Sequence, residues 1–363
     1  MTTLALRFPG APVRSQVRLE RGGLARLGTF TRRVTAARHV VLVTDPRVAR
    51  FHGEAALASL RRAGLAVDTV VVPNGEAAKR AGVLEGLWTA CAAAGLGRDG
   101  AIVALGGGVV GDLAGFAAAT WLRGVPWVGV PTSLLAQVDA SVGGKTAIDL
   151  AAGKNLVGAF HQPAGVLVDP DTLATLPARH RRNGLAEVIK TGFAVDARLW
   201  RWLESRLDAL ADGEPAALAG AVQRSIAAKA RVVAADEREG SLRAILNYGH
   251  TLGHVVEALC GYGTYLHGEA VAIGLVFAGE LAGAWERVGL DTAITQNDPA
   301  QSEAWNRGRY IVNGPGHCNE CHTPRTAIMT SDFSRYLAGG PHPEGEGKVP
   351  SLRSLIERGR YKD

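Results

Sequence analysis

The sequence has few cysteines, only four in 363 residues. Cys91 and Cys260 are isolated, and before residue 318 there is no cysteine framework of the kind that staples small secreted proteins. The first residues contain no positively charged segment leading into an apolar one, so we expect no signal peptide. The most apolar helical stretch, 270–285, contains Glu280 and is too short to span a bilayer comfortably. We therefore expect the first three hundred residues to belong to a cytoplasmic protein without a membrane span.

Blocks of like charge are also lacking. Lys and Arg number 40 and Asp and Glu 34, which gives a net charge of +6, but the basic residues are spread along the chain. Aromatic residues make up only 6%, so few are interleaved with the basic ones as a nucleic-acid interface would require. An anionic small molecule is therefore the simpler partner, and we expect no nucleic acid.

The first half of the chain alternates short β-branched runs with helical patterns. The strand candidates are 39–45, 65–73, 101–108, 126–132 and 164–170. The helix candidates between them include 53–63, 77–95 and 110–121. Continuous apolar runs of this length are typical of strands that are buried on both faces of a parallel sheet. The alternation predicts a doubly wound α/β nucleotide-binding domain.

The pattern changes at about residue 180, where long Ala/Leu/Arg segments with helical spacing begin. They predict an all-α domain packed against the first, with the active site in the cleft between the two. At about residue 292 the chain turns polar and irregular. We therefore predict three parts: an α/β domain over 1–178, a helical domain over 179–292, and an atypical tail over 293–363.

A glycine-rich turn, GGGVVGD at 106–112, follows a predicted strand and opens a predicted helix. Glycines there let backbone N–H groups approach a pyrophosphate, whose charge the helix N-terminus favours. The pattern departs from the usual G-x-G-x-x-G fingerprint, so alone it fits a plain strand–helix turn equally well.

Two lysines lie on a second glycine-rich segment, 138–155, which we expect to be a loop. Isolated lysines are usually solvated surface residues. Here Lys145 and Lys154 are close in sequence to Asp139 and Asn155, and this clustering favours a site that recognises phosphate or carboxylate.

Histidines and a glutamate occur in otherwise apolar helical segments. His250 and His254 are one helical turn apart and share a helix face, which is a recurring geometry of metal ligands. His267 follows, and Glu187 lies upstream. A single such residue is more often a hydrogen-bonded structural group, but a set of three His and one Glu predicts a zinc-type site with open positions for substrate.

Several cationic or amide donors lie near these residues in sequence. Arg243 and Asn247 precede His250 by seven and three residues, which would place them close to one helical face with it. Lys190 follows Glu187 by three residues, and Lys229 lies in a run that otherwise suits a solvated helix face. Such donors beside a metal would bind an anionic, polyhydroxylated ligand.

Taken together, these stretches resemble the 3-dehydroquinate synthases from about residue 30 to 290. The segments that carry the resemblance are GGGVVGDLAGFAAATWLRGVPWVGVPTSLLAQVDASVGGKTAID, GKNLVGAFHQP, LAEVIKTG, RAILNYGHTLGH and YLHGEAVAIG. SVGGK and GKNLVGAFHQP favour this family over the related sugar-phosphate cyclases that make valiolone or inosose skeletons.

The resemblance implies a set of site residues. The implied ligands of a divalent metal, zinc or cobalt, are Glu187, His250 and His267. The implied NAD contacts are Asp45, Glu76, Lys79, Gly108, Val109, Val110, Gly111, Asp112, Thr132, Ser133, Lys145, Lys154, Thr172, Leu173, Ala174 and Thr175. The implied substrate contacts are Arg123, Asp139, Lys145, Asn155, Lys190, Lys229, Arg243, Asn247 and His254. His254, which spacing alone would make a metal ligand, is thus assigned to the substrate.

The resemblance also implies the reaction and the assembly. In the family, 3-deoxy-D-arabino-heptulosonate 7-phosphate becomes 3-dehydroquinate and phosphate, a step of the shikimate pathway. NAD oxidises a ring hydroxyl, phosphate is eliminated, the hydride returns, and the opened ring closes by an aldol reaction. A homodimer is implied as well.

The family pattern stops at about residue 292, and the Asp-Lys-Lys segment expected beyond it is missing. From about residue 306 the chain resembles a cytochrome c fragment, with a C-x-x-C-H haem-attachment pattern at Cys318, Cys321 and His322. Without a signal peptide we do not expect haem to be attached there, and a recombined or misassembled gene explains the tail better. Capture of a metal by the two thiols is a minor alternative. The altered C-terminus predicts reduced stability and weak or absent turnover.

Other functions fit parts of the pattern. A metal-dependent NAD alcohol dehydrogenase would share the architecture but accumulate NADH, whereas a cyclase would not. Another sugar-phosphate cyclase, an electron-transfer protein defined by the tail, and a catalytically silent remnant are the remaining alternatives.

Overall fold

The structure is a computed structural model that describes residues 2–7, 14–261, 263–288, 340–341 and 348–349. By its contacts the chain divides into two compact units, residues 1–277 and 278–363. In the second unit, two short strands, β10 (Gly340–Pro341) and β11 (Lys348–Val349), pair antiparallel. The fold and the site described below belong to the first unit.

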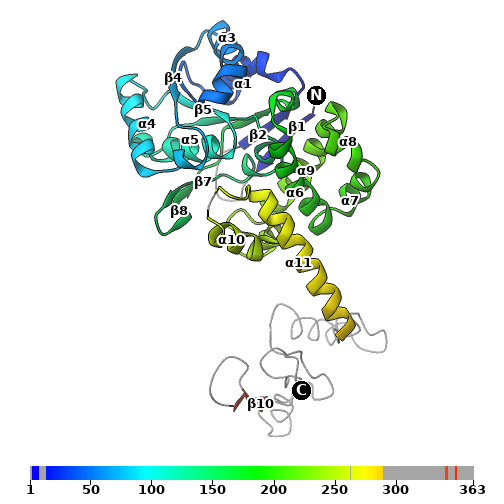
Figure 1. Ribbon diagram of the computed structural model, residues 1–363. Helices are drawn as coiled ribbons and strands as arrows, with labels where there is room; N and C mark the ends of the chain where they lie inside the picture. The colour runs from blue at the N-terminus through cyan, green and yellow to red at the C-terminus, as the bar shows by residue number, and fades with distance from the viewer. Residues whose placement is uncertain (1, 8–13, 262, 289–339, 342–347, 350–363) are drawn as a thin grey trace, which may run out of the picture. The chain divides into compact units, whose positions relative to one another are not determined.

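A seven-stranded sheet forms the centre of the first unit (Figure 1). Its order is β1-β2-β9-β6-β5-β3-β4, and every neighbouring pair is parallel except β1 and β2. The strands are β1 (Thr2–Arg7), β2 (Arg14–Leu19), β3 (His39–Thr44), β4 (Ala66–Val71), β5 (Ala101–Gly106), β6 (Trp127–Pro131) and β9 (Gly165–Val168). All five predicted strands are present, and the predicted α/β class is confirmed. The sequence analysis did not identify β1 and β2.

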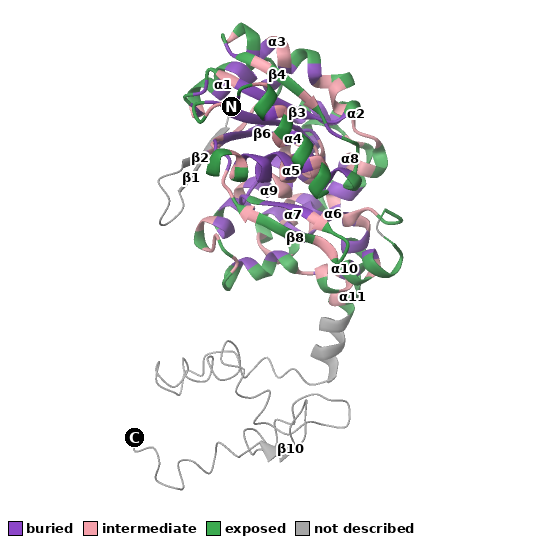
Figure 2. Cartoon of the chain, turned by 90° about the vertical axis from the view of Figure 1, so that its left-hand side faces the viewer, coloured by how far each residue is buried: buried purple, intermediate pink, exposed green. Residues whose placement is uncertain are grey.

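Helices cover both faces of this sheet because the inner strands are apolar on both sides. Along β3, Val40 and Leu42 pack with α1 (Leu27–Val34) and α3 (Glu54–Arg62). Val41 and Val43 point to the opposite face and pack with the core cluster that includes α4 (Ala81–Ala93) and α5 (Gly108–Thr120). The central strands are purple in Figure 2 because they are buried on both faces.

A group of helices follows the sheet, as predicted. The helices are α6 (Ala178–Ala194), α7 (Ala197–Glu204), α8 (Leu207–Asp212), α9 (Pro215–Ala235), α10 (His250–Leu259) and α11 (His267–Val288). A shared core joins α6, α7, α8 and α9 to side chains of β2 and β9, among them Val17 and Val166. Among the described residues, we find no helix that is long and apolar enough to cross a membrane.

Residues 145–155 of the segment expected to be a loop instead belong to a β-hairpin, so for them that prediction was wrong. Its strands are β7 (Lys145–Leu150) and β8 (Gly153–Phe160), which pair antiparallel outside the main sheet. Thr146, Ala147 and Ile148 are buried, and β7 packs against α5, whereas most of β8 is exposed (Figure 2). This tertiary packing overrides the weak strand signal of a glycine-rich sequence.

Two glycines offer a matched test of the packing between α1 and α3. A Cβ at Gly28 of α1 would overlap the backbone carbonyl of Ser59 in α3, whereas a Cβ at Gly86 of α4 would meet nothing within 4 Å. We expect Gly28→Ala to lower the free energy of unfolding by about 1–3 kcal/mol. Gly86→Ala should raise it by about 0.5–1 kcal/mol, because alanine is the better helix former. Urea unfolding measures both, and equal midpoints would contradict the described packing.

Candidate active site

Three adjoining cavities form one cleft in the first unit. The first has a volume of about 210 Å³ and lies at the glycine-rich turn. The second, of about 530 Å³, shares Gly108 and Val109 with it and reaches His254 and His267. The third, of about 550 Å³, shares Asp112, Asp139 and Asn155 with the second and contains most of the predicted substrate residues. The volume of the cleft is thus sufficient to hold a dinucleotide beside a second ligand.

The first cavity has the form expected for a nucleotide site. Gly107 caps α5 directly after β5, so the predicted strand–turn–helix arrangement is confirmed. Asp45 accepts hydrogen bonds from the backbone N–H groups of Arg47 and Val48 and lines the cavity. Thr132, Ser133 and Thr175 also line it, and Thr175 hydrogen-bonds His52 at 2.9 Å. Leu173 is buried in the core, so its side chain does not face the cavity.

A buried lysine, Lys79, lines the second cavity. Lys79 follows the short helix η3 (Glu76–Ala78) and donates to Asp112 at 2.8 Å and to Asn155. Burial alone would lower the pKa of Lys79, but Asp112, Glu76 and Asp149 outweigh it and raise that pKa. The ammonium is therefore held charged close to the glycine-rich turn.

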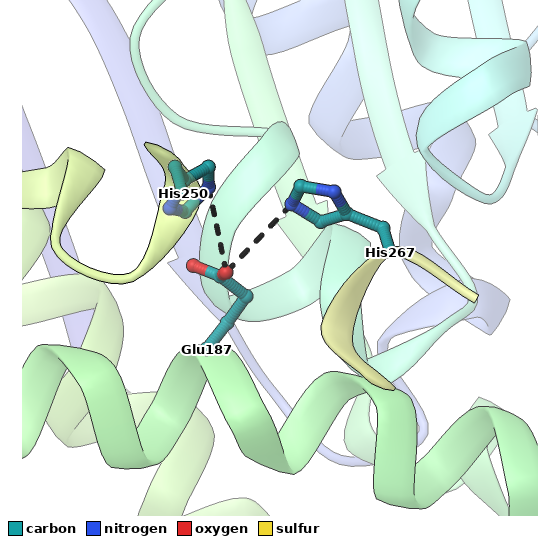
Figure 3. Close-up of side chains that lie close together, drawn as sticks. All are labelled: Glu187, His250 and His267. Carbon is teal, nitrogen blue, oxygen red and sulfur yellow. Dashed lines mark ion pairs between the residues drawn. The ribbon is translucent and has the colours of Figure 1, made fainter. Parts of the chain in front are cut away.

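The predicted metal ligands come together from three helices (Figure 3). Glu187 lies on α6, His250 opens α10, and His267 opens α11. The Nε2 atoms of His250 and His267 are each 3.8 Å from Oε1 of Glu187. Lys190, one turn further along α6, forms an ion pair with Oε2 of Glu187. This geometry supports the predicted ligand set.

The donor set fits a divalent metal on two grounds. Glu187 is fully buried, and its Oε1 accepts no hydrogen bond from any residue that the structure describes. A buried carboxylate oxygen without a donor is costly unless a cation lies beside it. Burial and the neighbouring Lys190 lower the pKa of His250 to about 3, so its imidazole is neutral, as a metal ligand must be.

His267, the third predicted ligand, is hydrogen-bonded to a residue that the sequence analysis missed. Glu257 of α10 accepts a hydrogen bond from Nδ1 of His267 at 3.2 Å and forms an ion pair with Lys154 at 3.1 Å. Burial would lower the pKa of His267, but Glu257 and then Glu187 outweigh it and raise that pKa. Burial would raise the pKa of Glu257, but His267 and Lys154 bring it down to about 2. The sequence could have indicated Glu257, because it follows His254 by three residues on one helix.

The third cavity gathers cations that are each held by a carboxylate or a carbonyl. Lys229 is buried and donates to Oδ1 of Asp139 at 2.6 Å. Arg243 is also buried and contacts the carbonyl of Gly143. Lys145 pairs with Glu239, which also accepts from Asn247 at 2.8 Å. Glu239 is a second residue that the sequence analysis missed.

One feature of this region departs from expectation. Arg243 and Asn247 do not share a helix with His250, because they lie on a short 3-10 helix, η7 (Leu242–Asn247). Gly249, with a φ of 80°, separates η7 from α10, and such a left-handed conformation breaks the helical spacing that we assumed. Lys229 lies on α9 and is buried, which argues against the alternative of a solvated helix face at this position.

Several predicted contacts lie away from the cleft or gain no support from it. Arg123 is exposed after α5, with a φ of 70°, and lines none of the three cavities. Ala174 is exposed and Thr172 is buried against Gln137. Their roles stay predictions. Cys318, Cys321 and His322 lie outside the described residues.

Comparison with known proteins now adds a second line of evidence. Residues 69–183 match the model of the 3-dehydroquinate synthase N-terminal domain, and residues 184–300 match that of the C-terminal domain. The chain belongs to the 3-dehydroquinate synthase family. It is 57% identical over 279 residues to the 3-dehydroquinate synthase of Synechococcus, covering 75% of each chain. It is 46% identical over 332 residues to that of Symbiobacterium thermophilum, covering 86% of this chain and 92% of the relative.

Solved structures of related cyclases share the family fold. A 2-deoxy-scyllo-inosose synthase in complex with carbaglucose-6-phosphate, NAD+ and Co2+ is 26% identical, with a TM-score of 0.71 over 86% of each chain. The 2-epi-5-epi-valiolone synthase of Streptomyces hygroscopicus subsp. jinggangensis, with NAD+ and Zn2+ bound, is 27% identical. Its TM-score is 0.67, covering 84% of this chain and 88% of that one. The resemblance to the 3-dehydroquinate synthases is thereby confirmed.

The depressed pKa of His250 predicts a pH effect on the metal-free protein. The ordinary value is 6.5 and the folded value is about 3, so between these pH values the unfolded chain binds a proton that the folded chain does not. Stability should therefore fall on acidification below pH 6.5, by up to about 1.4 kcal/mol per pH unit from this group. His250→Gln should remove that part of the slope. Urea unfolding in chelator between pH 7 and 5 measures it, and parallel slopes would refute the assignment.

Proposed function

We propose that this protein is a 3-dehydroquinate synthase that converts 3-deoxy-D-arabino-heptulosonate 7-phosphate to 3-dehydroquinate and phosphate. The observation that carries the proposal is the single cleft that joins the glycine-rich turn, the Glu/His/His cluster and the cation-rich cavity. Membership of the family supports the same reaction. A phosphorylated sugar acid is an anionic ligand, which the cations of the third cavity suit.

We assign different roles to the residues of the cleft. Lys145, Lys229 and Arg243 all line the third cavity and would bind the phosphate and carboxylate of the substrate. Asp139 is ionised beside Lys229, because Lys229 and Lys190 lower its pKa more than burial raises it. It holds the lysine in place and could accept a hydrogen bond from a substrate hydroxyl. Fixed cations around a leaving phosphate would stabilise the charge that develops as the C–O bond breaks.

The proposed cofactors are NAD, in the first cavity, and zinc or cobalt held by Glu187, His250 and His267. When bound, NAD would accept and return a hydride, and the metal would act as a Lewis acid on a substrate oxygen. Lys79 and the backbone of residues 108–112 would bind and orient the dinucleotide. The two cyclases described above bind these same kinds of cofactor, which supports the assignment.

A second candidate follows from the fold. A glycerol dehydrogenase from Schizosaccharomyces pombe shares it with a TM-score of 0.53 at 18% identity, which is a likeness of fold alone. A metal-dependent NAD alcohol dehydrogenase would accumulate NADH. The cations of the third cavity favour the cyclase, because a small neutral alcohol would not need them.

We further propose that the protein works as a cytoplasmic homodimer, in line with the family resemblance. Size-exclusion chromatography with light scattering tests the dimer. The effect of the unusual tail stays a prediction, and a normal kcat/KM for the purified chain would contradict the expected impairment. A covalent haem absorbance after expression would contradict the expectation that Cys318 and Cys321 carry no haem.

The reaction is tested by incubating the metal-loaded protein with NAD and the heptulosonate phosphate. We expect inorganic phosphate to be released while the absorbance of NADH does not increase, because no NADH accumulates. Glu187→Gln should abolish release, because it removes a ligand charge and leaves Lys190 buried without its partner. Glu85→Ala, on the exposed face of α4, serves as the matched control. Net NADH formation would favour the dehydrogenase, and no turnover despite bound NAD and zinc would indicate a silent remnant.

Binding of NAD is tested separately at Lys79. Lys79→Met removes a buried ammonium and leaves Asp112 without its ion-pair partner near the glycine-rich turn. We expect NAD to bind about 10- to 100-fold more weakly, which corresponds to the loss of one charge-assisted hydrogen bond. Isothermal titration calorimetry measures the dissociation constant. An unchanged constant would place the dinucleotide elsewhere.

A further inference from the structure

The buried carboxylate of Glu257 uses both of its oxygens. Oε2 lies 3.2 Å from Nδ1 of His267, and Oε1 lies 3.1 Å from Nζ of Lys154. Glu257 is only 4% exposed, so water does not supply alternative partners for most of its surface. The residue therefore connects one proposed metal ligand to a lysine on the β7–β8 hairpin.

The contact with Lys154 fixes what Glu257 can do to the histidine. A carboxylate paired with an ammonium is ionised and can only accept hydrogen bonds. Nδ1 of His267 must then carry the hydrogen of this bond, which leaves the lone pair of a neutral imidazole on Nε2. Nε2 is the atom that points at Oε1 of Glu187, 3.8 Å away (Figure 3).

The hydrogen bond that orients His250, the other histidine of the cluster, is weaker. Nδ1 of His250 lies 3.4 Å from the backbone carbonyl of Tyr248, which is a long and uncharged hydrogen bond. A carboxylate partner fixes the ring more firmly and makes the opposite nitrogen a better electron donor. Of the two histidines, His267 thus has the stronger support.

We propose that Glu257 is a positioning residue that holds His267 in the tautomer and orientation in which Nε2 binds the divalent metal. This inference rests on the proposed function, because it refers to the same metal. Lys154 in turn holds Glu257, and it also lies 3.8 Å from Glu76, which lines the second cavity. The chain His267–Glu257–Lys154–Glu76 therefore links the metal ligands to the residues expected around NAD.

The same atoms exclude a competing assignment. His254, Glu257 and His267 place ligand atoms within 4.8 Å of one another and could by spacing hold a cation of their own. The ammonium of Lys154 already lies against Glu257, and a second metal ion there would meet its positive charge. Glu257 thus supports one metal site and forms no second one.

The test measures zinc affinity, which a purely structural role would leave unchanged in a folded variant. Wild type, Glu257→Ala and Glu257→Gln are titrated with zinc in competition with a chromophoric chelator. We expect zinc to bind about 10- to 100-fold more weakly to Glu257→Ala, as for other residues that support a metal ligand. Glu257→Gln should lose less, because its amide oxygen can still accept from His267. Cobalt loading adds a spectroscopic check, since a displaced His267 would alter the visible absorption of the bound ion.

Glu85→Ala is the matched control, with an exposed carboxylate on α4 and an expected wild-type affinity. Circular dichroism in chelator shows whether each variant folds, and if Glu257→Ala does not, Glu257→Gln decides the question alone. Zinc affinity of the folded variants within about twofold of wild type would overturn the inference. Binding of two zinc ions to wild type, with only the second lost in Glu257→Ala, would also overturn it. Zinc binding that depends on Glu257, in a wild type that releases no phosphate, would support the inference and refute the proposed function instead.

Discussion

The buried carboxylate of Glu187 is the constraint on which the helical half of the site depends. Burial raises the pKa of Glu187, and Lys190 opposes that shift as an adjoining cation, while the Nε2 atoms of His250 and His267 lie 3.8 Å from Oε1. These groups come from three helices, so α6, α10 and α11 must meet at this point. The backbone of Gly268, next to His267, packs directly against Asn183 of α6 and leaves no room for a Cβ. Close helix packing and the charge cluster therefore require one another.

The cations of the cleft follow the same logic. Lys79, Lys154 and Lys229 are each paired with a carboxylate, namely Asp112, Glu257 and Asp139. Unpaired, such lysines would be costly to bury and would tend to lose their protons. Pairing fixes the direction of each side chain before any ligand arrives, and at Lys79 the carboxylates also raise the pKa above its usual value. The donors therefore need little reorganisation when an anion enters the cleft. The carboxylates compete with that anion for the same donors.

The sheet could be predicted from the sequence because its strands carry their own signal. A run such as VVLV in β3 is apolar on both faces, and the side-chain alternation that follows is a local property. The hairpin β7–β8 could not be found in this way. Its burial comes from packing on α5, and glycines at 143, 144, 153 and 158 weaken the strand pattern. When the secondary structure of a segment depends on packing against an element distant in sequence, the local sequence pattern predicts the wrong secondary structure.

The predicted metal ligands show the same limit at the level of single residues. Spacing on α10 makes His250 and His254 equivalent, since both lie on one helix face, with ring centroids 5.2 Å apart. Of the two, only His250 has an Nε2 recorded near Glu187, 3.8 Å from its Oε1, while His254 lines the cleft. Resemblance to the family made that choice, and helical periodicity could not. A ligand set assembled from three helices is decided by which helices meet, so spacing along any one of them can nominate candidates but cannot choose among them.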